Sequence, residues 1–111
     1  MEKIIPDYLH NLSSFLQKTL YSEIPENVIE RSRLVFADSM AAIIGGSAEP
    51  EVETLIKRMM ISKNPGTASV LGTGLSGEPM TVSVINGSAG TFLEMDEGNQ
   101  FCRGHPGMQV I

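Results

Sequence analysis

A short segment near the carboxyl end of the chain carries most of the side chains that could do chemistry. Three acidic residues, Glu94, Asp96 and Glu97, lie close together, and Arg103 and His105 follow in a glycine-rich stretch. Carboxylates this close repel one another, so we expect Arg103 or His105 to compensate them. Where compensation is incomplete, one carboxyl group holds its proton more tightly, which places an acid beside a base. The segment therefore predicts proton-transfer chemistry, and a solvated acidic helix end is the alternative.

Other kinds of site fit this segment less well. Gly98 stands where the third ligand of an EF-hand calcium loop is needed. Cys102 and His105 have a spacing found in zinc sites, yet only His10 could add another soft ligand, so no metal is predicted. A Cys102 nucleophile paired with His105 lacks a third residue to orient the pair.

A second motif lies upstream. Gly72, Gly74 and Gly77 match the glycine spacing of a dinucleotide-binding loop. In that fold the loop joins a strand to a helix, and a second strand carries an acid for the ribose. Here the preceding extended piece is short and no second apolar strand follows. We therefore expect a glycine-rich connection between helices, with dinucleotide binding as an alternative.

Hydrophobic periodicity predicts an all-α fold of about four helices that position these residues. The expected helices cover residues 7–20, 25–46, 51–61 and 79–95, with a short extended piece at 67–71. Residues 34–44 are apolar on every side of the second helix, which is typical of the interior of a large structure. Gly87 and Gly90 fall within the fourth helix, where we expect a backbone or a ligand to approach closely; alternatively, Asn86-Gly87 forms a turn.

The composition excludes several classes of protein. The 111 residues include 13 acidic and 8 basic ones, for a net charge of −5, and Arg103 is the only basic residue after Lys63, so no nucleic acid partner is expected. No apolar stretch approaches the ~20 residues of a membrane span and no signal peptide is evident, so we expect no membrane partner. The single Cys102 is in keeping with a cytoplasmic location.

The chain ends in Met108-Gln109-Val110-Ile111, without a polar tail or terminating turn. We therefore expect an amino-terminal fragment of a longer protein. Six short motifs follow one another along the chain, each occurring once, at residues 21–25, 38–46, 68–72, 86–87, 93–97 and 105–106. Together they resemble the amino-terminal part of the MmgE/PrpD family, which includes 2-methylcitrate dehydratase, cis-aconitate decarboxylase and iminodisuccinate epimerase.

The resemblance implies a fold and an activity. Residues 1–111 would be part of a large helical domain, with the rest of that domain and a smaller α/β lid domain absent, in a protein that forms homodimers. The implied enzyme is a lyase or epimerase that acts on a small di- or tricarboxylate without metal or cofactor. It removes a proton next to a carboxylate and then loses water or carbon dioxide, or reprotonates the carbon. Without the family's further histidines and lysines, the fragment alone would be inactive.

Two residues fall on the family's site positions. Glu94 and His105 are the expected catalytic residues, with His105 as proton donor or acceptor and Glu94 orienting it or a substrate group. Asp96 and Arg103 are the expected substrate-binding residues, and Asp96 helps to fix the turn. Glu94 replaces an aspartate of the family, and the spacing from it to His105 is one residue longer, so the exact reaction stays open. A non-catalytic helical module for binding or dimerisation is the alternative to an enzyme.

Overall fold

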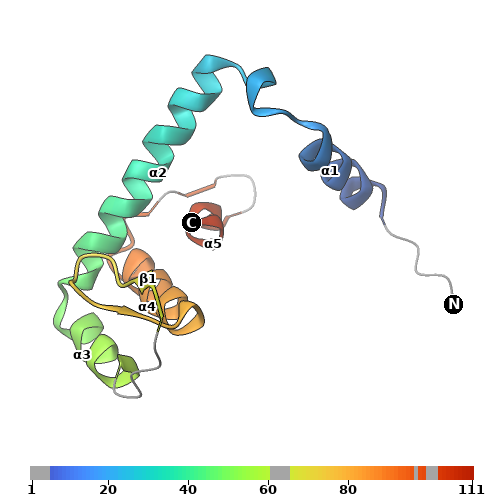
Figure 1. Cartoon of the computed structure of the whole chain (residues 1–111). Helices are drawn as coiled ribbons and strands as arrows, with labels where there is room; N and C mark the ends of the chain where they lie inside the picture. The colour runs from blue at the N-terminus through green and yellow to red at the C-terminus, as the bar shows by residue number, and fades with distance from the viewer. Residues whose placement is uncertain (1–5, 61–65, 97, 100–102) are drawn as a thin grey trace, which may run out of the picture. The chain divides into compact units, whose positions relative to one another are not determined.

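The structure is a computed structural model that describes residues 6–60, 66–96, 98–99 and 103–111. Those residues form helices, one short 3-10 turn and a two-stranded sheet, which confirms the predicted all-α class. They belong to two units, residues 1–32 and 33–111, whose elements are drawn in Figure 1. Across the described ranges, none of the helices combines the length and apolar character that crossing a bilayer demands.

The first unit contains α1 (Asp7–Lys18), the 3-10 turn η1 (Tyr21–Glu23) and the beginning of α2 (Glu26–Ser47). The predicted first helix is confirmed as α1, with an acidic residue in its first turn and Lys18 in its last, as the helix dipole favours. None of its residues is buried. The backbone N–H of Leu20 donates to Glu23 Oε2 at 3.2 Å, which closes the turn that leads to α2.

In the second unit α4 (Pro79–Phe92) holds the centre. It contacts α3 (Pro50–Met59), α5 (Pro106–Val110) and the two strands (Figure 1). Side chains from four parts of the chain form the buried core: Ile43, Val52, Ile56, Val70, Val82, Ile85 and Ala89. Because three of these belong to α4, the position of that helix depends on contacts along most of its length.

Small residues allow α2 and α4 to approach closely. A Cβ atom on Gly46 would overlap the carbonyl oxygen of Ala89 and lie 2.9 Å from its carbonyl carbon. A Cβ atom on Gly90 would overlap the sulfur of Met108 and lie 3.0 Å from Ile43. The fourth helix is thus closely approached at Gly90, by the side chains of Met108 and Ile43 and not by the expected backbone or ligand. At Gly87 an added Cβ would meet nothing within 4 Å.

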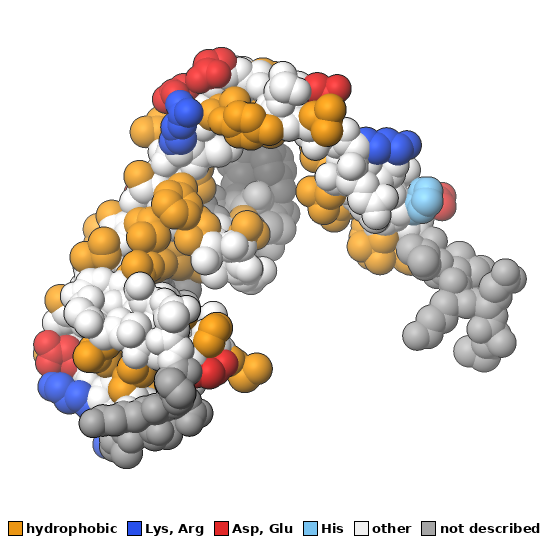
Figure 2. Space-filling view, in the orientation of Figure 1, with side chains coloured by type: hydrophobic (Ala, Val, Ile, Leu, Met, Phe, Trp, Pro, Cys, Tyr) orange, Lys and Arg blue, Asp and Glu red, His pale blue; other side chains and the backbone are white. Residues whose placement is uncertain are grey.

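Burial changes along α2 in the second unit. Ile43 is 3 % exposed, while Leu34 and Phe36 are 62 % and 54 % exposed. Figure 2 accordingly shows hydrophobic side chains gathered along this helix. Phe36 lies seven residues before Ile43 and so on the same side of the helix. Within the part of the chain that the structure describes, α2 is therefore covered near Ile43 and open near Leu34 and Phe36.

The glycine loop is the tip of a β-hairpin. Strand β1 (Ala68–Ser69) pairs antiparallel with β2 (Ser76–Gly77), and Ala68 lies opposite Gly77. Gly72 has a φ of +77°, a left-handed backbone that glycine adopts without strain. The expected extended piece is thus one arm of a hairpin.

Asn86 fastens this hairpin to α4. Its Oδ1 accepts a hydrogen bond from the N–H of Leu71 at 3.1 Å, and its Nδ2 donates to the carbonyl of Ser69 at 3.1 Å. The side-chain amide thus accepts one hydrogen bond from the hairpin backbone and donates one to it, as the backbone of a neighbouring strand does. Asn86 and Gly87 both lie inside α4, so the alternative of a turn at this point is wrong.

Candidate active site

The acidic segment leaves α4 through a left-handed turn. Leu93 caps the helix, and Glu94 follows with a φ of +53° while its N–H donates to the carbonyl of Thr91 at 3.2 Å. Glycine is the usual residue here, because other residues pay roughly 1–2 kcal/mol for this backbone. The side chain of Glu94 is exposed. A charged residue in a strained, exposed position is a candidate for a functional role.

Asp96 instead turns into the protein. Its side chain is only 1 % exposed. Both carboxylate oxygens are buried, and neither accepts a directed hydrogen bond from the residues that the structure describes. An ionised carboxylate in such surroundings costs several kcal/mol unless a positive or hydrogen-bonding group offsets it. Asp96 therefore needs a partner with a proton or a charge.

His105 lies against this carboxylate. Its Nδ1 atom is 3.0 Å from Asp96 Oδ2, which is the distance of an ion pair, although the imidazole is not aligned for a hydrogen bond. Rotation about the outer side-chain bond of histidine is soft, and catalytic hydrogen bonds are often poorly aligned before substrate binds. The His105 side chain is 45 % exposed. The pair thus has one buried member and one that solvent can reach.

An open cavity of about 360 Å³ adjoins His105. Its other lining residues are Gly98, Asn99, Arg103 and Gly104. Its rim is held by two backbone hydrogen bonds, from Asn99 N–H to Gly104 at 2.9 Å and from Arg103 N–H to Asn99 at 2.8 Å. Arg103 has a left-handed φ of +51°. A guanidinium and an imidazole on one cavity are suited to a carboxylate ligand.

The structure brings together some of the predicted site residues and not others. Asp96 lies against His105, and His105 and Arg103 line the same cavity, but Glu94 is not among its lining residues. The residue against His105 is therefore Asp96, where the sequence had favoured Glu94. Glu97 and Cys102 lie outside the described residues. Within the described ranges, no cluster of His, Cys, Asp and Glu could hold a metal ion.

The glycine motif does not form the expected surroundings of a phosphate. In a dinucleotide-binding loop the first N–H groups of the helix bind the phosphate. Here the carboxylate of Glu78 accepts those hydrogen bonds, from Met80 at 2.9 Å and Thr81 at 2.8 Å. The same bonds hold the pKa of Glu78 below its ordinary value of 4.5. This geometry favours the predicted connection between helices over dinucleotide binding.

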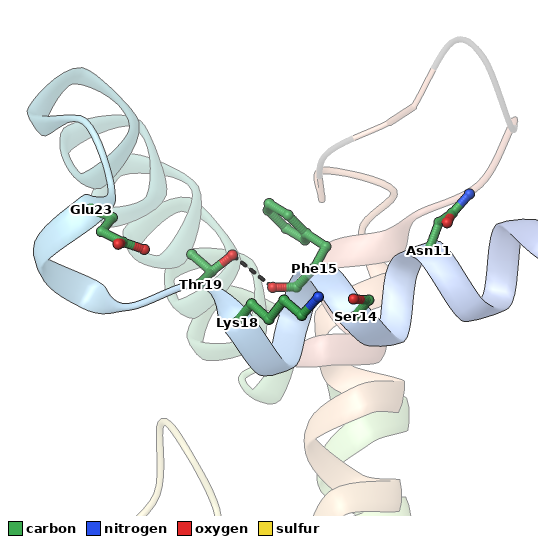
Figure 3. A pocket seen from close by; sticks show the side chains of 6 residues that line it. All are labelled: Asn11, Ser14, Phe15, Lys18, Thr19 and Glu23. Atoms are coloured by element: carbon green, nitrogen blue, oxygen red, sulfur yellow. Dashed lines mark hydrogen bonds between the residues drawn. The ribbon is translucent and has the colours of Figure 1, made fainter.

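A second open cavity, of about 390 Å³, lies in the first unit (Figure 3). Six side chains line it: Asn11, Ser14, Phe15, Lys18, Thr19 and Glu23. Two are already engaged, because Thr19 Oγ1 donates to the carbonyl of Phe15 at 2.7 Å and Glu23 accepts from Leu20. None of the lining residues is buried. None of the residues that line the cavity near His105 is buried either, but His105 lies 3.0 Å from a buried carboxylate, and this contact makes that cavity the stronger candidate.

These features define a class: a helical domain that carries a candidate proton-transfer site, with a buried carboxylate beside a half-exposed histidine. Residues 10–111 match the MmgE/PrpD N-terminal domain, so the chain belongs to this family. The resemblance drawn from the sequence is confirmed. No curated protein and no solved structure matches the chain.

Proposed function

We propose that this chain is part of a cofactor-independent lyase or epimerase that acts on a small di- or tricarboxylate. Membership of the MmgE/PrpD family supports the class of enzyme. Among the residues, the observation that carries the proposal is the position of His105, 3.0 Å from the carboxylate of Asp96 and on the wall of an open cavity. Imidazole is the side-chain group best suited to exchange protons near neutral pH.

The proposed reaction begins with the removal of a proton from the carbon next to a substrate carboxylate. His105 accepts that proton. In a dehydration, the freed electron pair forms a double bond, and the leaving hydroxyl takes up a proton and departs as water. A decarboxylation differs in its first step: the carbon–carbon bond to a carboxylate breaks, carbon dioxide leaves, and His105 in its protonated form gives its proton to the carbon that keeps the electron pair. In an epimerisation, a proton returns to the opposite face of the carbon.

The other site residues have supporting roles in this proposal. Arg103 lines the cavity with His105 and binds a substrate carboxylate through charge-assisted hydrogen bonds. Glu94 is exposed just beyond the end of α4 and orients a substrate group. Its strained backbone supports such a role, because glycine would satisfy the fold at lower cost.

Several properties of the whole protein belong to the same proposal. Residues 1–111 form part of a helical domain, and a longer polypeptide supplies the rest of the site and a lid. The enzyme is a cytoplasmic homodimer and needs neither metal nor cofactor. The open apolar part of α2, with Leu34 62 % exposed and Phe36 54 % exposed, supports contact with further protein.

The test uses the polypeptide expressed from its complete open reading frame. Release of water or carbon dioxide is measured with a panel of di- and tricarboxylates, and epimerisation by loss of optical rotation. His105→Gln should lower kcat by about 10²–10⁴-fold, the usual contribution of general acid–base catalysis. His10→Gln is the matched control, because His10 is exposed on α1, and it should keep full activity. Full activity of His105→Gln, or no turnover by the wild-type protein, would refute the proposal.

A further inference from the structure

The two members of the Asp96–His105 pair have different surroundings. Asp96 is 1 % exposed at its side chain and does not line the cavity, whereas His105 is 45 % exposed and does. The imidazole therefore meets a buried carboxylate through Nδ1 and offers its remaining edge to the cavity. Such an arrangement distinguishes the two ring nitrogens, which are chemically similar in a free histidine.

The short distance constrains the position of the imidazole proton. At 3.0 Å, an unprotonated Nδ1 and a carboxylate oxygen would repel each other because both atoms carry partial negative charge, so one of the two atoms must carry a hydrogen. A carboxylate only accepts hydrogen bonds. A proton shared between a carboxylate and an imidazole rests on the imidazole, which is the stronger base. The contact is therefore satisfied when Nδ1 carries the proton.

We propose that Asp96 is the positioning residue for His105: it holds a proton on Nδ1 and leaves Nε2 as the atom that exchanges protons with the substrate. The inference rests on the proposed function and deepens it, since it names the reacting nitrogen. Nε2 of the neutral ring takes the substrate proton, and the resulting imidazolium is stabilised by the adjacent carboxylate. Nε2 then gives the proton back, while the proton on Nδ1 stays in place throughout.

Burial of Asp96 makes this carboxylate better suited to the task than Glu94. Neither Asp96 oxygen accepts a directed hydrogen bond from the described residues, so its interaction with His105 has no competitor among them. A charge in such a site is also less screened by water than an exposed one. Glu94 is two residues away in sequence but exposed, and it therefore provides a matched control for the loss of a nearby negative charge.

The test is a measurement of the histidine tautomer by long-range ¹H–¹⁵N correlation in histidine-labelled protein of the full open reading frame. Each imidazole is assigned from its own substitution, and His10 serves as an exposed internal reference. In the wild type near pH 8, His105 should carry its proton on Nδ1. Asp96→Asn should shift the proton toward Nε2, and Glu94→Gln should leave the His105 signals unchanged.

Kinetics provide the second readout. Asp96→Asn should lower kcat by at least about tenfold, up to the full 10²–10⁴-fold of general acid–base catalysis, with KM little changed. A wild-type His105 with its proton on Nε2 would overturn the inference without any variant, even if Asp96→Asn failed to fold. Equal effects of Glu94→Gln and Asp96→Asn on the tautomer would also overturn it. The proposed function fails separately, if His105→Gln keeps full activity.

Discussion

The contact between α2 and α4 permits a sharp test of the fold with two neighbouring glycines. Gly45 and Gly46 both lie inside α2. At Gly46 an added Cβ atom would overlap the backbone of Ala89, whereas at Gly45 it would lie 3.5 Å from a methyl group of Leu93, an ordinary contact. Gly46→Ala and Gly45→Ala therefore make the same chemical change in the same helix with different steric consequences.

The expected magnitudes follow from two opposing effects. Alanine is more favourable than glycine inside a helix by about 1 kcal/mol, and both variants gain this amount. At Gly46 the new methyl group would lie 2.9 Å from the carbonyl carbon of Ala89, so the two backbones must separate. Overpacking of this kind typically costs about 1–3 kcal/mol, and more where backbone is in the way. Gly45→Ala should be neutral or stabilising, and Gly46→Ala should be less stable than Gly45→Ala by about 1–3 kcal/mol.

Thermal and urea unfolding of the three proteins measure the difference. In a domain of about 100 residues 1 kcal/mol corresponds to about 4–8 °C in Tm, and in one of about 150–250 residues to about 2–4 °C, so the two variants should be resolved in either case. The urea m-value should not change, because only packing is altered. If Gly46→Ala is as stable as Gly45→Ala, then α2 and α4 do not approach at Ala89, and the reasoning about this contact is refuted.

Two further predictions concern residues that join the hairpin to α4. The pKa of Glu78 is lowered by the N–H groups of Met80 and Thr81, so its carboxylate stabilises the fold above its unfolded pKa and this contribution is lost as pH falls through the folded value. Glu78→Gln should therefore lower Tm at pH 7 and not in acid below that value, and an equal difference at every pH would contradict the assignment. Asn86→Ala removes both hydrogen bonds to the hairpin and leaves the Leu71 N–H without its acceptor, so urea unfolding should show that the free energy of unfolding falls by about 1–3 kcal/mol. An unchanged midpoint would show that these hydrogen bonds do not hold the hairpin to α4.

The helices could be predicted because their signals are local. Periodic apolar residues and prolines at 50 and 79 place α3 and α4 within a few residues of their observed starts. The Gly45-Gly46 pair predicts the end of α2 to within one residue, since the helix ends at Ser47, and Gly46 also permits the close approach to α4. The five-residue α5 is too short for periodicity to reveal, and its position depends on packing of Met108 against α4.

The site was predictable in its residue types and not in its pairing. The sequence indicates that carboxylates near residue 95 meet a histidine, but Glu94 and Asp96 are equally acidic and nearly equally distant along the chain. The left-handed backbone at Glu94 decides between them, since Asp96 is buried beyond that turn while Glu94 is exposed. The sequence does not indicate this turn, because the residue that usually marks such a turn is glycine and this position holds Glu94. The hydrogen bonds from Asn86 to the hairpin could not be predicted for a similar reason, because their partners Leu71 and Ser69 lie 15 and 17 residues before Asn86 in the chain.

Both members of the Asp96–His105 pair are anchored to one helix. Asp96 lies four residues beyond the end of α4, and His105 directly precedes α5, whose Met108 packs at Gly90 of α4. The distance between the two side chains is therefore set by a common frame and not by the length of chain that joins them. A larger side chain at position 90 would therefore disturb the site without touching it.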